Sequence, residues 1–160
     1  MMGEGAAIEP AVDGRQSEAA TMICRGVRRL LVSLGYSSLP EVPLRSGRRA
    51  DVLALNARGE IWIIEIKSSL ADFRADQKWP DYRAHCDRLF FATSQDVPAE
   101  IFPPDAGLIV ADGYGAAIVR DLPAVALPAA TRKEVHLRFA RAAADRLHAL
   151  HDPAFLIERW

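Results

Sequence analysis

Two apolar runs joined by a short polar turn constrain the fold of this chain most strongly. DVLAL (residues 51–55) and IWIIEIK (residues 61–67) have strand length, and residues 56–59 between them have turn chemistry. Such a pattern predicts an antiparallel β-hairpin. With the turn centred near Arg58, paired residue numbers sum to about 116, which places Asp51 opposite Glu65, or one position away if the loop is even.

The remaining periodicities predict helices and short strands around this hairpin. Apolar residues at spacings of three and four indicate amphipathic helices over 17–34 and 131–150. A short strand is expected at 41–44, and RLFFATS, GLIVAD and AAIVR have strand length. The segment 70–87 is helical in character, with Pro80 in the first turn of a second short helix. The order α-β-β-β-α-β-β-β-α predicts an α/β fold, one mixed sheet flanked by helices.

Length and composition are those of one ordinary domain. The chain has 160 residues, of which 50% are hydrophobic, and a net charge of -1. We expect a flexible tail over 1–16, a single domain over 17–152 and a C-terminal tail over 153–160. The net charge gives no global basic footprint, so nucleic-acid binding would rest on local clusters.

The compartment is inferred from the cysteines and from the apolar segments. Cys24 and Cys86 lie far apart and outside any zinc-ligand spacing. The first residues lack the basic and apolar regions of a signal peptide, and no segment approaches the roughly 20 apolar residues of a membrane span. We therefore expect a soluble cytoplasmic protein that makes no membrane contact.

Charged side chains interrupt the second strand of the hairpin. Glu65 and Lys67 are two positions apart and share one face, on which Asp51 of the first strand is also expected. Two facing carboxylates destabilise a sheet unless a positive group lies between them. Mg²⁺ is typically held by one or two carboxylates, with waters and phosphate oxygens completing its shell. The Ile66 carbonyl would add a ligand, and Lys67 would stabilise a hydroxide or the transition state.

Two interpretations of these residues remain open from the spacing alone. One is a metal site for phosphodiester chemistry, in which the neighbouring Arg45, Arg48 and Arg49 contact a phosphate backbone. The other is a structural charge network at the end of a sheet, with the arginines solvated on a hairpin edge.

Asp51, the following hairpin and Glu65-Ile66-Lys67 resemble the PD-(D/E)xK nuclease core, although Ala50 stands where the motif has proline. Five segments taken together resemble the MmcB-like family of bacterial proteins associated with DNA repair and mutagenesis. This second resemblance covers roughly residues 17–150. The segments are GRRADVLAL, GEIWIIEIKSS, DFRADQKWPDY, CDRLFFA and GLIVADGYGA.

The resemblance implies a restriction-endonuclease-like fold and a nuclease that cuts DNA with Mg²⁺ or Mn²⁺, as an endonuclease rather than an exonuclease. Asp51, Glu65 and Lys67 would be catalytic, and Glu18 or Glu41 would complete the metal ligands. The helix that follows Glu65-Ile66-Lys67 would face the site. DNA repair proteins are expected partners and a dimer is compatible with the superfamily. Further DNA contacts would come from Gln77, Lys78 and Tyr82.

A second function, from a different class, is a catalytically silent module of the same fold that binds DNA or docks a repair complex. The modest net charge favours it slightly. An RNA-directed nuclease is a remoter alternative.

Overall fold

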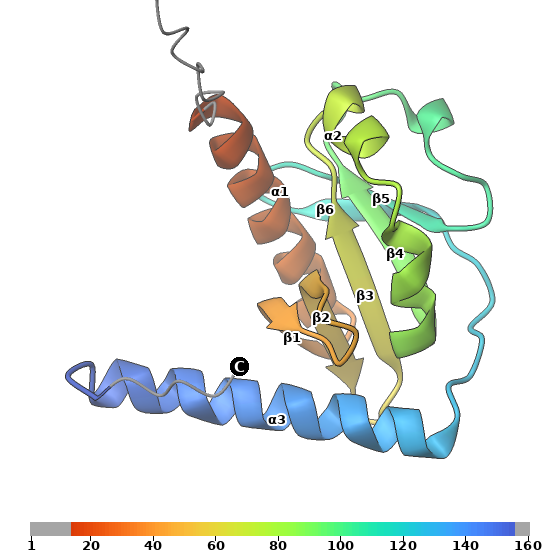
Figure 1. The fold of residues 1–160 in the computed structure, drawn as a ribbon. Coiled ribbons are helices and arrows are strands. Elements are labelled where there is room, and N and C mark those ends of the chain that lie inside the picture. The colour runs from red at the N-terminus through yellow and green to blue at the C-terminus, as the bar shows by residue number, and fades with distance from the viewer. Residues whose placement is uncertain (1–13, 156–160) are drawn as a thin grey trace, which may run out of the picture.

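A computed structural model describes residues 14–155, with side chains from residue 18 onward. The chain forms one mixed sheet with flanking helices, in the predicted order (Figure 1). Two 3₁₀ segments, η1 (Trp79–His85) and η2 (Ala99–Ile101), lie on either side of β4 along the chain. The helices and strands are α1 (Gly14–Ser33), β1 (Tyr36–Pro43), β2 (Arg49–Asn56), β3 (Ile61–Ile66), α2 (Leu70–Ala75), β4 (Arg88–Thr93), β5 (Gly107–Ala111), β6 (Ala116–Arg120) and α3 (Ala129–His151).

The six strands lie in the sheet in their order along the chain. β1, β2 and β3 are antiparallel neighbours, β3, β4 and β5 are parallel, and β6 is antiparallel to β5. Parallel strands need a crossover connection. Between β3 and β4, α2 and η1 provide it, so the end of β3 is followed at once by helical structure.

The hairpin register agrees with the sequence-based expectation. Leu53 pairs with Ile63 and Val52 with Ile64, so partner numbers sum to 116. The expected strand over 41–44 is too short, because β1 begins at Tyr36 and pairs with β2 as far as Asn56. Local alternation does not reveal its first residues, since an edge strand is held by the ladder to its neighbour.

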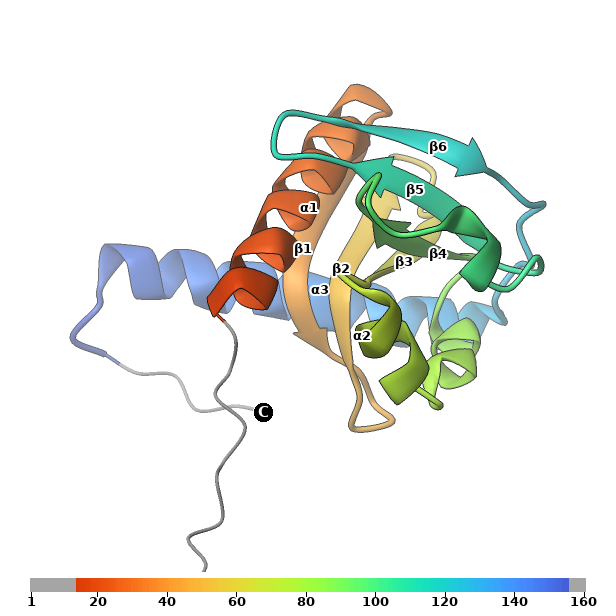
Figure 2. The same cartoon turned by 90° about the horizontal axis from the view of Figure 1, so that it is seen from above.

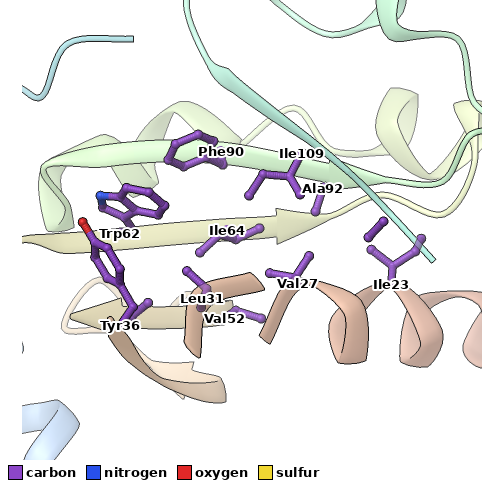
Figure 3. Packing of buried hydrophobic residues seen from close by; sticks show 12 residues of the cluster. Ile23, Val27, Leu31, Tyr36, Val52, Trp62, Ile64, Phe90, Ala92 and Ile109 are labelled. Atoms are coloured by element: carbon purple, nitrogen blue, oxygen red, sulfur yellow. The ribbon is translucent and has the colours of Figure 1, made fainter. Parts of the chain in front are cut away.

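Apolar layers cover both faces of the sheet. Ile23, Val27 and Leu31 of α1 pack on one face, against strand residues that include Ile64 and Phe90 (Figure 3). The opposite face is covered by Tyr82 of η1, by Cys86 just after η1, and by Val135 of α3. Figure 2 shows α1 and α3 on different sides of the hairpin strands. Alternation along β3 therefore gives both faces an apolar layer.

A buried aspartate ties the start of α3 to the sheet. Both carboxylate oxygens of Asp87 accept hydrogen bonds from Arg132 of α3, at 2.5 and 2.7 Å. The same carboxylate accepts the backbone N–H groups of Ile61 at 2.7 Å and Leu127 at 3.0 Å. Asp87 is only 6% exposed, so this network fixes the crossover into the last helix.

The termini lie partly outside the described residues. Of the expected N-terminal tail, 1–13 lies outside them, whereas α1 already begins at Gly14. Of the expected C-terminal tail, 156–160 lies outside them, and α3 ends at His151. Within 14–155, no helix has the length and apolar character needed to cross a membrane.

Candidate functional site

The hairpin strands β2 and β3 separate at one end. Their ladder stops at Val52 and Ile64, although each strand continues. Beyond that point Ala50 pairs with β1, and Ile66 pairs with Ala92 of β4. A fork therefore opens between the strands, and its backbone N–H groups need other acceptors.

The predicted acidic pair fills this fork. Asp51 Oδ2 accepts the backbone N–H of Ile66 at 2.8 Å, and Glu65 Oε1 accepts the backbone N–H of Asp51 at 3.1 Å. Each carboxylate thus reaches across to the other strand. The two side chains satisfy the opened backbone and, at the same time, are brought next to each other.

Burial and mutual repulsion disfavour two negative charges at this place. Burial, followed by the negative charge of Asp51, raises the pKa of Glu65 to about 9. Burial also raises the pKa of Asp51, and the Ile66 N–H and the Lys67 ammonium offset this only in part. Because Glu65 is only 3% exposed, water screens the repulsion weakly. The pair therefore favours a proton or a cation between its oxygens.

Lys67 lies next to the pair but is bonded to another acid. Its Nζ is 2.8 Å from Oδ2 of Asp76, the residue that follows α2, and both side chains are largely buried. Burial raises the pKa of Asp76, but the hydrogen bond and charge of Lys67, together with the backbone N–H groups of Lys78 and Trp79, outweigh it and the net shift is downward. The residues between Lys67 and Asp76 carry no local signal of this contact.

A groove of about 1450 Å³ runs over the acidic pair. One wall is α1, with Arg25, Arg28 and Arg29, and the other includes Asp72 and Asp76 on the α2 side. The sequence-based hypothesis does not include the three arginines, although their spacing of three and four places them on one side of a helix. Ser69 is the N-cap of α2, and its hydroxyl accepts the backbone N–H of Asp72.

Of the two acids proposed to complete a metal site, Glu41 lines the groove and Glu18 does not. Glu41 stands opposite Asp51 in the β1–β2 register, since Pro40 pairs with Val52 and Val42 with Ala50. Its φ of 50° breaks the ladder there.

The strained backbone at Glu41 is held by α3. Arg146 donates to the carbonyl oxygens of Pro40 and Glu41 at 2.5 and 2.7 Å. The Glu41 side chain is 66% exposed, and its Oε1 lies 3.7 Å from Nη2 of Arg49. Among residues 14–155, no three His, Cys, Asp or Glu side chains converge as metal ligands.

Most of the residues predicted to contact DNA lie outside the groove lining. Arg48 is paired with Asp81 at 2.9 Å, and Arg45 and Arg49 are exposed but absent from the groove lining. Tyr82 does line the groove, although its hydroxyl donates to the Arg49 carbonyl at 2.9 Å. Gln77 and Lys78 are exposed beyond α2, outside the groove lining, and Gln77 donates to the Arg74 carbonyl.

The donor atoms in the fork suit a hard cation. Asp51 and Glu65 provide carboxylate oxygens, and Ile66, whose carbonyl could add a third oxygen, directly follows Glu65 in β3. Mg²⁺ requires only one or two carboxylates because it retains several waters. The residues present therefore fit such an ion with Asp51 and Glu65 as its protein carboxylates.

Comparison with known proteins identifies the family. The model of the family described as "DNA repair protein MmcB-like" matches residues 7–154. The chain belongs to the MmcB-like family. The match spans every helix and strand of the fold and the whole groove, which confirms the resemblance drawn from the five sequence segments.

One solved structure is similar to this chain over most of the length of both proteins. It is the SPO1766 protein of unknown function from Silicibacter pomeroyi, with 47% sequence identity and a TM-score of 0.82. The similarity covers 87% of this chain and 95% of that one. Comparison with curated proteins gives no match. The MmcB-like family name associates the chain with DNA repair.

Proposed function

We propose that this chain is a nuclease that hydrolyses DNA phosphodiester bonds with Mg²⁺ or Mn²⁺, in the context of DNA repair. The proposal includes a restriction-endonuclease-like core and endonucleolytic cutting. The observation that carries it is the fork between β2 and β3, where Asp51 and Glu65 meet under the open groove. Membership in a family described as DNA repair proteins supports DNA as the substrate class.

The proposed roles follow from position. Asp51, Glu65 and the Ile66 carbonyl would hold the cation, which when bound would offset phosphate charge and lower the pKa of a water molecule. Lys67 is bonded to Asp76, and this ion pair suits charge stabilisation in the groove. Glu41 is the better candidate for a further ligand, because it borders the groove opposite Asp51. Its strained backbone is a feature common at functional sites.

A specific observation favours the second candidate function, a catalytically silent DNA-binding or docking module. Within the described part of the chain, no third acidic, histidine or cysteine side chain joins the pair. Lys67 is also already bonded to a carboxylate. Such a module would use the same groove to bind DNA, with the acidic pair serving only to close the fork in the sheet.

Cleavage assays separate these candidates. Purified wild-type protein and the variants Asp51→Asn, Glu65→Gln and Lys67→Ala are incubated with end-labelled single-stranded, duplex, flap and junction DNA. Each reaction contains Mg²⁺, Mn²⁺ or EDTA. We expect cleavage that requires metal and falls at least about 100-fold in each variant. The Asn and Gln replacements keep the shape of the carboxylates, so the fold is preserved.

Asp96→Asn is the matched control, because Asp96 is exposed on the loop after β4 and outside the groove lining. It should cut at the wild-type rate. Cleavage retained in both acid variants would refute the site. No cleavage of any substrate by the wild-type protein, with DNA still bound in a gel shift, would establish the silent module instead.

A further inference from the structure

The basic wall of the groove lies on α1 and not on the β1–β2 connection. Arg25, Arg28 and Arg29 all line the groove. Arg28 donates to the side chain and the carbonyl of Ser38 at 3.1 and 3.2 Å, and Arg29 donates to the Tyr114 carbonyl at 3.2 Å. These bonds fix the positions of both guanidinium groups, and neither has a carboxylate partner among the described side chains.

Arg25 is the most available of the three. It is exposed, and its side chain makes no hydrogen bond or ion pair with the side chains and backbone described over residues 18–155. It lies on the groove side of α1, one helical turn before Arg28 and Arg29. Over three to four residues the helix rises about 4.5–6 Å, so the three charges form a short line along α1.

The opposite side of the groove is acidic. Asp51, Glu65, Asp72 and Asp76 line it, yet none of them pairs with the α1 arginines among the described residues. A groove with unpaired positive charge on one side and an acidic, cation-favouring pair on the other suits a polyanion. Its phosphates would contact the arginines, and one of them would approach a cation at the pair.

The size of the groove also favours an occupant larger than a small molecule. Its volume of about 1450 Å³ exceeds the roughly 300–1,000 Å³ of pockets for small molecules. Proteins that hold nucleic acid strands use a positively charged groove that follows the backbone. We propose that Arg25, with Arg28 and Arg29, is the phosphate-binding wall of this groove, and that a nucleic acid strand lies along α1 there.

This assignment rests on the proposed function for the identity of the ligand, but it makes a separate claim about binding. The sequence-based hypothesis gives the phosphate contacts to Arg45, Arg48 and Arg49. In the structure these three are outside the groove lining, and Arg48 is held by Asp81. Binding should therefore depend on α1 and be nearly independent of Arg45.

The test is fluorescence anisotropy with labelled single-stranded and duplex oligonucleotides in EDTA, where metal-dependent cutting is absent. Wild-type protein is compared with Arg25→Ala, Arg25→Lys, Arg45→Ala and Arg58→Ala between about 50 and 200 mM salt. Arg58 is an exposed arginine at the far end of the hairpin and is the matched control.

We expect Arg25→Ala to weaken binding about three- to ten-fold and to lower the slope of log affinity against log salt by about 0.7 for the single strand or 0.9 for the duplex. Arg25→Lys should retain most of the slope, because it keeps the charge. Arg45→Ala and Arg58→Ala should bind within about two-fold of wild type. The form bound more tightly identifies the strand state.

Equal affinities for Arg25→Ala and Arg58→Ala, or no binding by the wild-type protein, would overturn the assignment. The outcome is distinguishable from failure of the proposed function. Arg25-dependent binding without any cleavage in Mn²⁺ would leave the phosphate wall intact and reject the nuclease. Metal-dependent cleavage together with binding that does not depend on Arg25 would support the nuclease and reject the phosphate wall.

Discussion

The proton shared by Asp51 and Glu65 should make stability fall as pH rises. Burial and the charge of Asp51 raise the pKa of Glu65 from 4.5 to about 9 in the folded protein. Between these values the folded state binds a proton that the unfolded chain has released. The stabilising contribution is therefore fully present below about pH 4.5 and is lost as the pH rises towards 9.

Replacing Glu65 by glutamine removes this titration and keeps the shape of the neutral acid. One proton corresponds to about 1.4 kcal/mol per pH unit, so the wild-type free energy of unfolding should fall by about 2.7 kcal/mol more than that of Glu65→Gln between pH 6 and pH 8. Below about pH 4.5 the two proteins should have similar stability, and the variant should become progressively more stable than the wild type as the pH rises to 8.

Urea denaturation in EDTA, followed by circular dichroism at several pH values, measures this difference. With a slope of about 1–3 kcal/mol/M, the midpoints should separate by about 1 M urea or more near pH 8. Parallel pH profiles for the two proteins would refute the inference that Glu65 is held neutral. Asp96→Asn provides the control for an exposed acid, and its profile should follow wild type.

A divalent cation should substitute for the proton. Adding Mn²⁺ near pH 8 should raise the wild-type stability by about 2.7 kcal/mol at 100 times the dissociation constant, because the ion binds only the folded fork. Glu65→Gln should gain much less. Calorimetry should show Mn²⁺ binding that Asp51→Asn abolishes. An unchanged midpoint in Mn²⁺ would count against a cation at this pair.

Three further predictions concern the framework of the site. A Cβ on Gly26 would clash with the Asp112 carbonyl oxygen. Gly26→Ala should therefore lower the free energy of unfolding, measured in a urea titration, by about 1–3 kcal/mol. Gly115→Ala should lower it far less, because a Cβ there meets nothing within 4 Å. Asp87→Ala should cost about 3–5 kcal/mol, because it leaves a partly buried arginine without its carboxylate and two N–H groups without their acceptor. A thermal shift no larger than that of an exposed aspartate would contradict this. Glu41→Gly should leave the unfolding midpoint nearly unchanged. Glu41→Val should lower the free energy of unfolding by about 1–2 kcal/mol, because valine tolerates a positive φ poorly. Equal midpoints for the two variants would argue against strain at this position.

Local patterns in the chain suffice to predict the hairpin and the residues that meet across it. Strand alternation and a short turn set the register to within one position, so the spacing predicts that Asp51 and Glu65 come together at the end of the hairpin. The order of helices and strands follows from the same short-range periodicities. These features depend on residues close in the chain, where backbone geometry leaves few alternatives.

The partners of the charged side chains, by contrast, depend on how the elements pack. Lys67 is bonded to Asp76 across the β3–α2 junction, and Arg48 is bonded to Asp81 instead of facing the groove. The arginines that line the groove come from α1, whose position on the sheet is set by the packing of Val27 and Leu31. Long side chains select partners according to how helices pack on the sheet, and this geometry is not written in the spacing of residues along the chain.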